Sequence, residues 1–570
     1  MARVGLGLRI SGGDDEAQTV GRVNGDMRTR SLARVVLLSF VLAGFGVGAF
    51  AQGTGDYEDL VSLFHEFRAF GEPEVIDGLP DYSNVAMAKQ ARELKGYQAR
   101  LAAIDPRGWP VPDQIDYHLV RAEMNGLEFR HRVLKPWVLD PGFYNDRMPR
   151  VGRGADLPIA GDELAEFRAR LASVERFLEQ ARRNLSDLSR VAADLGTVAV
   201  LSLGDTRASF ESLAARAADA QPELTPDVEA AMAAIDGYVE WIETNKPKMT
   251  ARAGVGKENY NWLLKNVYLF PYTWDDVRTI VELEDNRVIA FGRLEENRNQ
   301  NTPRLTPVAS QEEYRESIRE AVGHIMNFLR EGEVFSLDLI KVSDEYFHSR
   351  WEQKGYFLDQ PWPEKHDYFF NFSHREAVME NTHELVGHHF DQLRAKVAER
   401  PIRRGRRPYN IGTARGEGFA FALEELLMHA GYLDGRSPRG REIAYEQAAF
   451  RTVRALSDIY MHNQEWTYDE AYAFCVANAP HGELLDGSHH LWFELDTTLR
   501  GVGHHMLMVV GKVQFMKLFR DRAQQLGDEF VLRDFMDEFL SSASIPMSLI
   551  RWEMTGYTDE IETLWPYGDE

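Results

Sequence analysis

Three histidines and a glutamate lie within seven consecutive residues, His383-Glu384-Leu385-Val386-Gly387-His388-His389. Neutral imidazole is a preferred ligand of Zn²⁺, and a zinc ion with an open position lowers the pKa of a bound water towards about 7. A carboxylate next to the first ligand can then accept a proton from that water. The segment therefore predicts a zinc hydrolase site, with His383 and His388 as ligands and Glu384 as the general base.

The spacing of the two ligands predicts a distortion of the helix that carries them. In a regular α-helix, residues five apart diverge by about 140°, whereas residues four apart diverge by about 40°. One extra residue in a turn, a π-bulge made easier by Gly387, would bring His388 back to the face of His383. His389 is the less favoured ligand, and we expect it beside the site.

A second helix is predicted from Glu417 to about Ala430, because Gly431 follows as a C-terminal stop. Glu417 and Glu424 lie seven residues apart and share one face of this helix. A carboxylate on an otherwise apolar face must be paired or bound to metal. Glu417 is the predicted third ligand, and Glu424 is predicted to orient a ligand. The alternative for Glu417 is a solvated residue at the favourable N-terminal pole of the helix.

The composition argues against several other functions. The chain has 65 basic and 89 acidic residues, and its formal net charge of −24 disfavours nucleic acid and anionic membranes as partners. A single cysteine, Cys475, excludes an intrachain disulfide and any CxxC motif. Any bound metal would therefore have to be held by histidine, aspartate and glutamate side chains. The chain contains no P-loop and no GxSxG motif, so we predict neither nucleotide hydrolysis nor ordinary serine-hydrolase chemistry.

The N-terminus has the three parts of an export signal. A basic stretch after Met27 precedes an apolar run from Val35 to about Val47, and Ala49-Phe50-Ala51 forms a small-x-small cleavage site. The apolar run is too short to span a bilayer comfortably, and no cysteine follows it for lipid attachment. We expect residues 1–51 to be a leader and signal peptide, and the mature protein to be periplasmic or extracellular without a stable membrane anchor. An uncleaved apolar helix is the alternative.

Beyond the signal, the hydrophobic period is helical. Apolar residues recur at three- and four-residue steps from Leu164 to Leu185, and Thr225-Pro226 is a predicted N-cap with proline at the first helical position. Strand-like alternation is scarce, so the predicted fold class is mainly α. We expect an N-terminal helical region, residues 52–250, and a helical metal-site region, residues 251–570, in one continuous body.

The ends of the histidine helix are predicted from local signals. Ser373 and Glu376 match an S-x-x-E capping box, and Pro401 stops the periodic segment downstream.

These motifs resemble those of known families. The hexapeptide HELVGH is similar to that of dipeptidyl peptidase III. HE followed by GHH and then by EGFAFALEE resembles domain-of-unknown-function family 885 (DUF885), a bacterial family whose usual patterns are HExxPGHH and EGWALYxE. The resemblance covers most of the mature chain, because three further segments match: Gly256 to Trp262; Arg454, Asp458, His462, Trp466 and Thr467; and Leu526 to Pro546.

The resemblance implies a secreted zinc peptidase with a two-lobed, zincin-like (gluzincin-type) helical architecture, similar in plan to angiotensin-converting enzyme and neurolysin. This sequence departs from the family pattern at three places. It lacks the proline of HExxPGHH, which leaves the choice between His388 and His389 open. His504 and Met508 replace a glutamine and a tyrosine, and Met536 replaces a histidine. Substrate preference therefore cannot be transferred.

Further polar residues are candidates near the reaction centre. His462, His504 and Arg500 could hydrogen-bond the developing oxyanion, and the alternative for each is a structural polar group. Between the two predicted metal-site helices lies a basic loop, which could clamp a carboxylate, although a solvated loop is the preferred interpretation. Its arginines are Arg400, Arg403, Arg404, Arg406 and Arg407. The doublet His489-His490 has no carboxylate at ligand spacing and is predicted to lie on the surface.

Three functional hypotheses follow. The first is a secreted metallopeptidase that acts on peptides or short oligopeptides, in which one zinc ion polarises the scissile carbonyl and Glu384 activates water and later protonates the leaving amine. The second is a non-catalytic metal- or peptide-binding protein, in which His389 or Glu424 closes the site as fourth ligand. The third is a metal-dependent hydrolase of another amide or ester. Mn²⁺ and Co²⁺ accept similar ligands, and the sequence makes no prediction of the oligomeric state.

Overall fold

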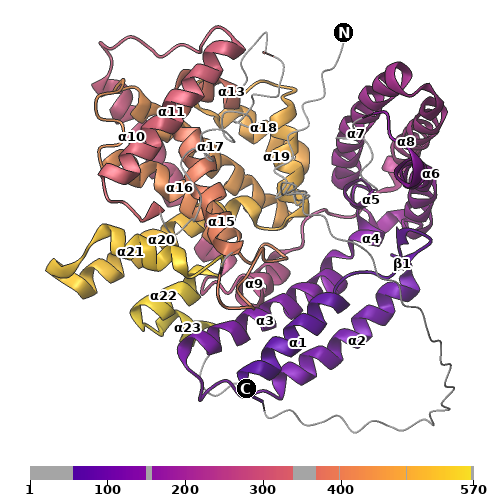
Figure 1. Ribbon diagram of the computed structural model, residues 1–570, viewed down its shortest axis with the longest axis horizontal. Helices are drawn as coiled ribbons and strands as arrows, with labels where there is room; N and C mark the ends of the chain where they lie inside the picture. Colours follow the sequence, from indigo (N-terminus) through magenta and orange to yellow (C-terminus); the bar gives the residue numbers. More distant parts are fainter. Residues whose placement is uncertain are drawn as a thin grey trace, which may run out of the picture.

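The computed structural model describes residues 55–148, 157–337, 362, 368–396, 398–482 and 484–565. This part of the chain is mainly helical (Figure 1), which confirms the predicted fold class. In the described ranges the only strands are β1 (Val75–Ile76) and β2 (Leu79–Pro80), which pair antiparallel. Among the described helices, none is long and apolar enough to span a bilayer. The predicted signal peptide, residues 1–51, lies outside the described residues.

The first three long helices pack side by side (Figure 1): α1 (Tyr57–Phe70), α2 (Asn84–Ala102) and α3 (Val111–Phe129). One face of α1 is apolar at helical spacing and buries Leu60, Leu63 and Phe64. α3 continues directly into a π-helical segment, η1 (Arg130–Leu134). Apart from Met87 of α2, the buried hydrophobic residues of these helices belong to the same hydrophobic cluster as those of residues 260–564.

A second hydrophobic cluster lies between residues 79 and 249. Its helices are α4 (Pro136–Leu139), α5 (Phe143–Arg147), α6 (Gly161–Asn184), α7 (Ala193–Ala220) and α8 (Thr225–Asn245), and the last three stand together in Figure 1. α6 buries Leu171, Val174 and Leu178, as its period predicts. Thr225 is the first helical residue of α8 and not its N-cap, because the turn before it is already a 3₁₀-helix, η3 (Pro222–Leu224).

The remaining helices include α17 (Gly440–His462), of which nearly every residue is buried and which contacts helices both before and after it in the sequence. Those before it are α9 (Lys257–Asn266), α10 (Trp274–Arg298), α11 (Gln311–Glu331), α13 (Tyr368–Arg375), α14 (Ala377–Asn381), the π-helix η6 (Thr382–Phe390), α15 (Asp391–Lys396) and α16 (Thr413–His429). Those after it are α18 (Tyr468–Asn478), α19 (His489–Arg500), α20 (His504–Leu526), α21 (Leu532–Ser541), α22 (Met547–Thr555) and α23 (Asp559–Leu564). Short 3₁₀ turns are η2 (Leu188–Arg190), η4 (Lys246–Lys248), η7 (Pro480–Gly482) and η8 (Gly527–Glu529).

Helices α16 and α20 touch through their backbones. A Cβ atom added at Gly418 would lie 2.6 Å from the Cα atom of Gly511, a distance that real Cβ atoms do not adopt. Glycine at both positions therefore permits an approach that a larger side chain would prevent. This contact fixes α16, the helix that carries Glu417, against the bundle.

Candidate metal centre

The histidine motif lies on a π-helix. α14 passes directly into η6, which includes all three motif histidines. Because the hydrogen bonds of a π-helix join residues five apart, His383 and His388 point the same way. Their Nε2 atoms lie 3.1 Å apart, with the rings nearly perpendicular at 87°. The predicted π-distortion is confirmed, and it places His388 rather than His389 opposite His383.

The helix does not begin as its local signals predict. Ser373 lies inside α13 and is buried, so it caps nothing. Glu376 has an extended backbone, with φ of −152°, and its own carboxylate accepts a hydrogen bond from the backbone nitrogen of Val378 at 3.2 Å. Glu376 itself is thus the N-cap of α14 and breaks the segment into two short helices. The predicted capping box is wrong because Glu376 plays the part assigned to Ser373.

Gly387 controls how closely η6 approaches α16. A Cβ atom added at Gly387 would lie 2.7 Å from the Cα atom of Ala420. Glu417 and Glu424 lie three residues before and four residues after Ala420, on the same face of α16. The contact therefore brings both carboxylates to the histidines.

His383, His388 and Glu417 form a compact triangle of ligand atoms. The Oε2 atom of Glu417 lies 3.7 Å from Nε2 of His383 and 3.5 Å from Nε2 of His388. Four ligands held tetrahedrally at about 2.0–2.1 Å from a zinc ion lie about 3.3 Å from one another. The three edges, including the 3.1 Å between the two histidines, match this geometry. Within the described ranges no other group of three His, Cys, Asp or Glu ligand atoms is this close together.

Glu424 and Arg451 fix the orientation of His383. The Nδ1–H group of His383 donates to Oε1 of Glu424 at 2.7 Å, and Arg451 donates to both oxygens of that carboxylate at 2.6 and 3.0 Å. A histidine that donates from Nδ1 presents the lone pair of Nε2 to a cation. Glu424 is 1% exposed, so its charge needs the Arg451 partner.

The electrostatics favour positive charge between these side chains. Burial and the charge of Arg451 act to lower the pKa of His383, but hydrogen bonds with Glu417 and Glu424 outweigh them and raise that pKa to about 10. Burial acts to raise the pKa of Glu417, yet His388 and His383 hold it well below its ordinary value. The arrangement can therefore accept a divalent cation in place of protons.

The family described as "Bacterial protein of unknown function (DUF885)" matches residues 68–554, which is more than half of the chain. The chain belongs to the DUF885 family.

Two solved structures share the fold of this DUF885 protein. A candidate lipoprotein of unknown function from Shewanella oneidensis is 16% identical, with a TM-score of 0.65. A candidate lipoprotein from Colwellia psychrerythraea is 14% identical, with a TM-score of 0.63. Each alignment covers 88% of this chain and 99% of the other. No curated protein matches the chain.

Glu384, the predicted base of this DUF885 protein, is half-buried beside the triangle. Burial acts to lower the pKa of His388, but Glu417 raises it above its ordinary value, and the negative charge of Glu384 adds to this effect. It also acts on Glu380, whose pKa is raised to about 7, first by burial and then by Glu384. Glu380 is 2% exposed and accepts a hydrogen bond from Nε2 of Gln447 at 2.7 Å.

Two buried charged residues near the triangle, Glu380 and Arg451, were not predicted from the sequence. Glu380 precedes Glu384 by four residues, a spacing that places both on one face of a helix. Arg451 follows the apolar run Ala448-Ala449-Phe450. A charge in such a run requires a buried partner, and this is the signal that could have revealed it.

His504 is the predicted oxyanion residue whose pKa responds to a residue of the triangle. It is the first residue of α20 and is half-buried. Burial lowers its pKa, and the charge of Glu417 opposes this shift. His389 is half-buried next to His388 and is not one of the three clustered residues.

His462 and Arg500 are not brought to the triangle. His462 is fully buried, and its Nε2–H donates to the carbonyl oxygen of Thr498 at 3.0 Å. Arg500 forms ion pairs with Asp146 and Asp496, both at 3.0 Å, on the wall of a separate cavity. Both donors are thus used for structural contacts, as in the alternative interpretation.

The basic loop is mostly structural, which corrects the expectation of a solvated loop. Arg400 and Arg403 both form ion pairs with Asp116 at 2.7 Å, and Arg407 pairs with Glu123 at 2.6 Å. Arg404 and Arg406 are exposed. Arg406 makes no ion pair with the part of the chain described, and its charge contributes to the lowered pKa of His504.

The prediction that the His489-His490 doublet is a surface feature without carboxylate partners is wrong. His490 is buried and lies 3.1 Å from Glu494, one helical turn away. His489 lies 2.7 Å from Asp205 of α7. The second contact joins two helices that are far apart in the sequence, so the local pattern did not contain it.

Proposed function

We propose that this DUF885 protein is an exported zinc metallopeptidase that hydrolyses peptides or short oligopeptides. The observation that carries the proposal is the triangle of His383, His388 and Glu417, with edges of 3.1 to 3.7 Å. Glu384 follows the first ligand directly in the sequence, as the base does in metal-dependent proteases.

Each residue has a distinct part in the proposed reaction. His383, His388 and Glu417 would hold one zinc ion. When bound, that ion would activate water and polarise the scissile carbonyl. Glu384 would take a proton from the attacking water and deliver it to the leaving amine, so that one water and one amide yield one carboxylic acid and one amine.

The contacts of Glu424 favour a catalytic site with an open coordination position over a site in which a fourth protein ligand fills that position. Glu424 is held by Arg451 at 2.6 Å and bonds to Nδ1 of His383, on the side of the ring away from the triangle. It is therefore poorly placed to act as a fourth ligand. A three-ligand site leaves one position for water, which is typical of catalytic zinc.

Export is part of the proposal. The N-terminal sequence has a basic stretch, an apolar run and a small-x-small site in the order of a signal peptide. The two proteins of similar fold are described as candidate lipoproteins. We therefore propose that the mature protein acts in the periplasm or outside the cell.

The test uses the purified mature protein and a mixed peptide pool, with and without a chelator, analysed by mass spectrometry. We expect new peptide ends when the protein is present without chelator, and none when the chelator is added. Glu384→Gln should retain stoichiometric zinc and lose hydrolysis. The matched control is Glu312→Gln, which removes an exposed carboxylate on α11 and should retain full activity.

Stoichiometric zinc with no cleavage of any peptide would contradict the peptidase proposal and favour a binding protein. Full activity in Glu384→Gln would overturn the role of that residue.

A further inference from the structure

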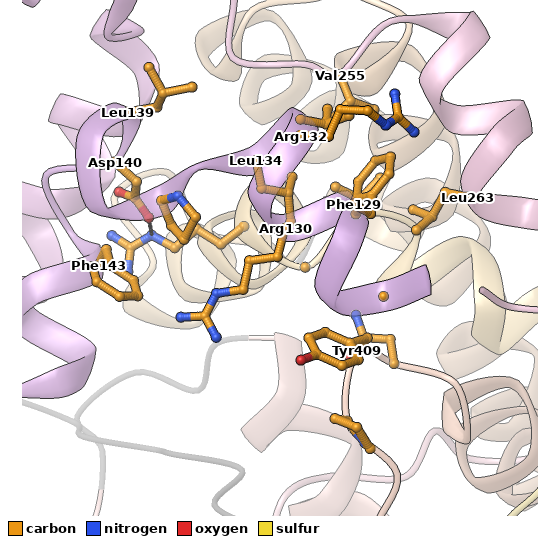
Figure 2. Close-up of a pocket in the computed structure, with 18 of the residues that line it drawn as sticks. Phe129, Arg130, Arg132, Leu134, Leu139, Asp140, Phe143, Val255, Leu263 and Tyr409 are labelled. Atoms are coloured by element: carbon orange, nitrogen blue, oxygen red, sulfur yellow. Dashed lines mark ion pairs between the residues drawn. The ribbon is translucent and has the colours of Figure 1, made fainter. Parts of the chain in front are cut away.

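A cavity of about 1090 Å³ lies where the N-terminal helices meet the metal-site region (Figure 2). Its walls include parts of α3 and η1, of α4 and α5, the loop of residues 408–410, and residues 499–502 at the end of α19 and just beyond it. The volume is large enough for a short peptide or a similar organic molecule.

The cavity is basic, although the protein as a whole carries a formal charge of −24. Seven arginines line it, against three acidic residues. Three of the arginines have acidic partners: Arg68 pairs with Glu123, Arg132 with Glu128, and Arg500 with Asp140, Asp146 and Asp496. The side chains of the other four form no hydrogen bond or ion pair with any described residue, and these four are Arg130, Arg147, Arg190 and Arg252.

Arg130 is the most informative of these four. Figure 2 shows its side chain extending from η1 into the space between Phe143 and Tyr409. Its guanidinium lies 5.6 Å from the centroid of the Phe143 ring and is half-buried. Burial and the nearby charge of Arg147 lower its pKa, so a bound anion would relieve an unfavourable charge.

Two residues in one wall of the cavity have a backbone conformation that residues other than glycine rarely adopt. Tyr409 and Asn410 both have left-handed backbones, with φ of 57° and 59°. This conformation is unfavourable for residues other than glycine, because their Cβ atom approaches the following carbonyl oxygen. Gly126 permits the Tyr409 ring to lie against α3, because an added Cβ would come within 2.5 Å of Cγ of that ring. The strained loop thus fixes an aromatic side chain opposite Arg130.

The same loop connects the cavity wall to the metal centre. A Cβ atom added at Gly501 would lie 3.3 Å from Nδ2 of Asn410 and 3.7 Å from Cβ of His504. Burial lowers the pKa of His504, and the charge of Glu417 acts against this shift. His504, three residues from the cavity-wall residue Gly501, is thus a link between this wall and the metal centre.

We propose that this cavity binds the carboxylate groups of acidic peptides and thereby selects substrates for the neighbouring metal centre. Carboxylates fit because guanidinium groups bind them in pairs of parallel hydrogen bonds, and the aromatic walls can contact the aliphatic parts of the ligand. The selection of substrates rests on the proposed function, whereas the binding of acidic peptides does not.

The test measures peptide binding to zinc-loaded Glu384→Gln protein by isothermal titration calorimetry at low ionic strength. The probes are tri-glutamate, tri-glutamate amide and tri-glutamine. Both glutamate peptides should bind at least about tenfold more tightly than tri-glutamine. A difference between tri-glutamate and its amide reports the contribution of the C-terminal carboxylate, as distinct from that of the side chains.

Variants connect the preference to the cavity. Arg130→Gln and Arg252→Gln should each weaken tri-glutamate binding by about fivefold or more and leave tri-glutamine binding unchanged. Arg252 is exposed, so this second variant keeps the test valid if Arg130→Gln fails to fold. The matched control, Arg304→Gln, makes the same change of charge at an exposed position outside the cavity and should have no effect.

Equal affinity for tri-glutamate and tri-glutamine, no binding of any probe, or an equal loss in Arg304→Gln would overturn the proposal. Binding of tri-glutamate by a protein that hydrolyses no peptide would instead contradict the proposed function and leave this inference standing. Hydrolysis of peptides without any preference for acidic ones would contradict this inference and leave the proposed function standing.

Discussion

Gly387 of η6 lies directly against Ala420 of α16, so that no side chain fits between the two backbones. The geometry of the proposed zinc site depends on this contact, because Glu417 and Glu424 flank Ala420 on one helix face. A small displacement of η6 would separate the histidines from both carboxylates at once.

We expect Gly387→Ala to lower the free energy of unfolding by about 1–3 kcal/mol, since the added methyl group overpacks the contact. It should also weaken zinc binding, measured by competition with a chromophoric chelator. Gly323→Ala is the control, because this mid-helix glycine of α11 has open space at its Cβ. That change should be neutral or stabilising by about 0.4–1 kcal/mol. Unchanged zinc affinity in Gly387→Ala would contradict the role assigned to the contact.

Zinc should stabilise the folded protein through the three ligands. A ligand present at about 1,000 times its Kd adds about 4 kcal/mol to the free energy of unfolding. We expect a chelator to lower the Tm and added zinc to restore it in the wild-type protein. His383→Ala, His388→Ala and Glu417→Gln should lose this zinc-dependent increase.

His389→Ala separates the two possible second ligands. His389 is not one of the three clustered residues, so its variant should keep most of the zinc-dependent increase in Tm. If His389→Ala lost the increase and His388→Ala kept it, the ligand assignment would have to be reversed.

The role of Glu424 can be measured against its neighbour Glu425. Both carboxylates form ion pairs, but the buried Glu424 bonds to His383 and Arg451, whereas the half-buried Glu425 pairs with Arg287 and Lys512, both at 2.6 Å. We expect Glu424→Gln to weaken zinc binding by about 10–100-fold, because it removes the group that orients a ligand. Glu425→Gln should destabilise the fold, measured by urea unfolding, with little change in zinc affinity. Equal zinc affinities in the two variants would show that Glu424 acts only through stability.

The sequence predicted those parts of the site that depend on short spacings. The i, i+5 separation of His383 and His388 was enough to infer a π-distortion, and the i, i+7 separation of Glu417 and Glu424 placed both on one face. These inferences succeed because the number of residues per turn determines which residues of a helix lie on the same face.

Contacts between distant segments could not be predicted in this way. Nothing near Gly387 in the sequence indicates that Ala420 packs against it, and nothing near Arg130 indicates an arginine-lined cavity that also needs residues 408–410. The family resemblance suggested His462 for the reaction centre, but the imidazole is bonded to Thr498 in the core. Such pairings arise from the packing of whole helices, which a pattern of residue types does not specify.

The buried His462 makes the stability of the fold sensitive to acid. Burial lowers its pKa to about 4, and the hydrogen bond to Thr498 only partly offsets this shift. An unfolded histidine has a pKa of about 6.5, so below that pH the unfolded chain binds a proton that the folded protein does not. Stability is therefore lost as the pH falls from about 6.5 to about 4. At pH 5 the loss attributable to this residue is about 2 kcal/mol.

His462→Gln tests this origin of acid sensitivity. Its amide nitrogen can still donate to the carbonyl oxygen of Thr498, but the side chain does not titrate. The free energy of unfolding, measured in urea, should fall between pH 7 and pH 5 by about 2 kcal/mol less in the variant than in the wild-type protein. Between pH 7 and pH 8 the free energies of unfolding of the two proteins should change with pH in the same way, since the histidine is neutral in both folded and unfolded chains there. Identical slopes between pH 7 and pH 5 would mean that a proton reaches His462 without unfolding, and the structural role assigned to this histidine would then fail.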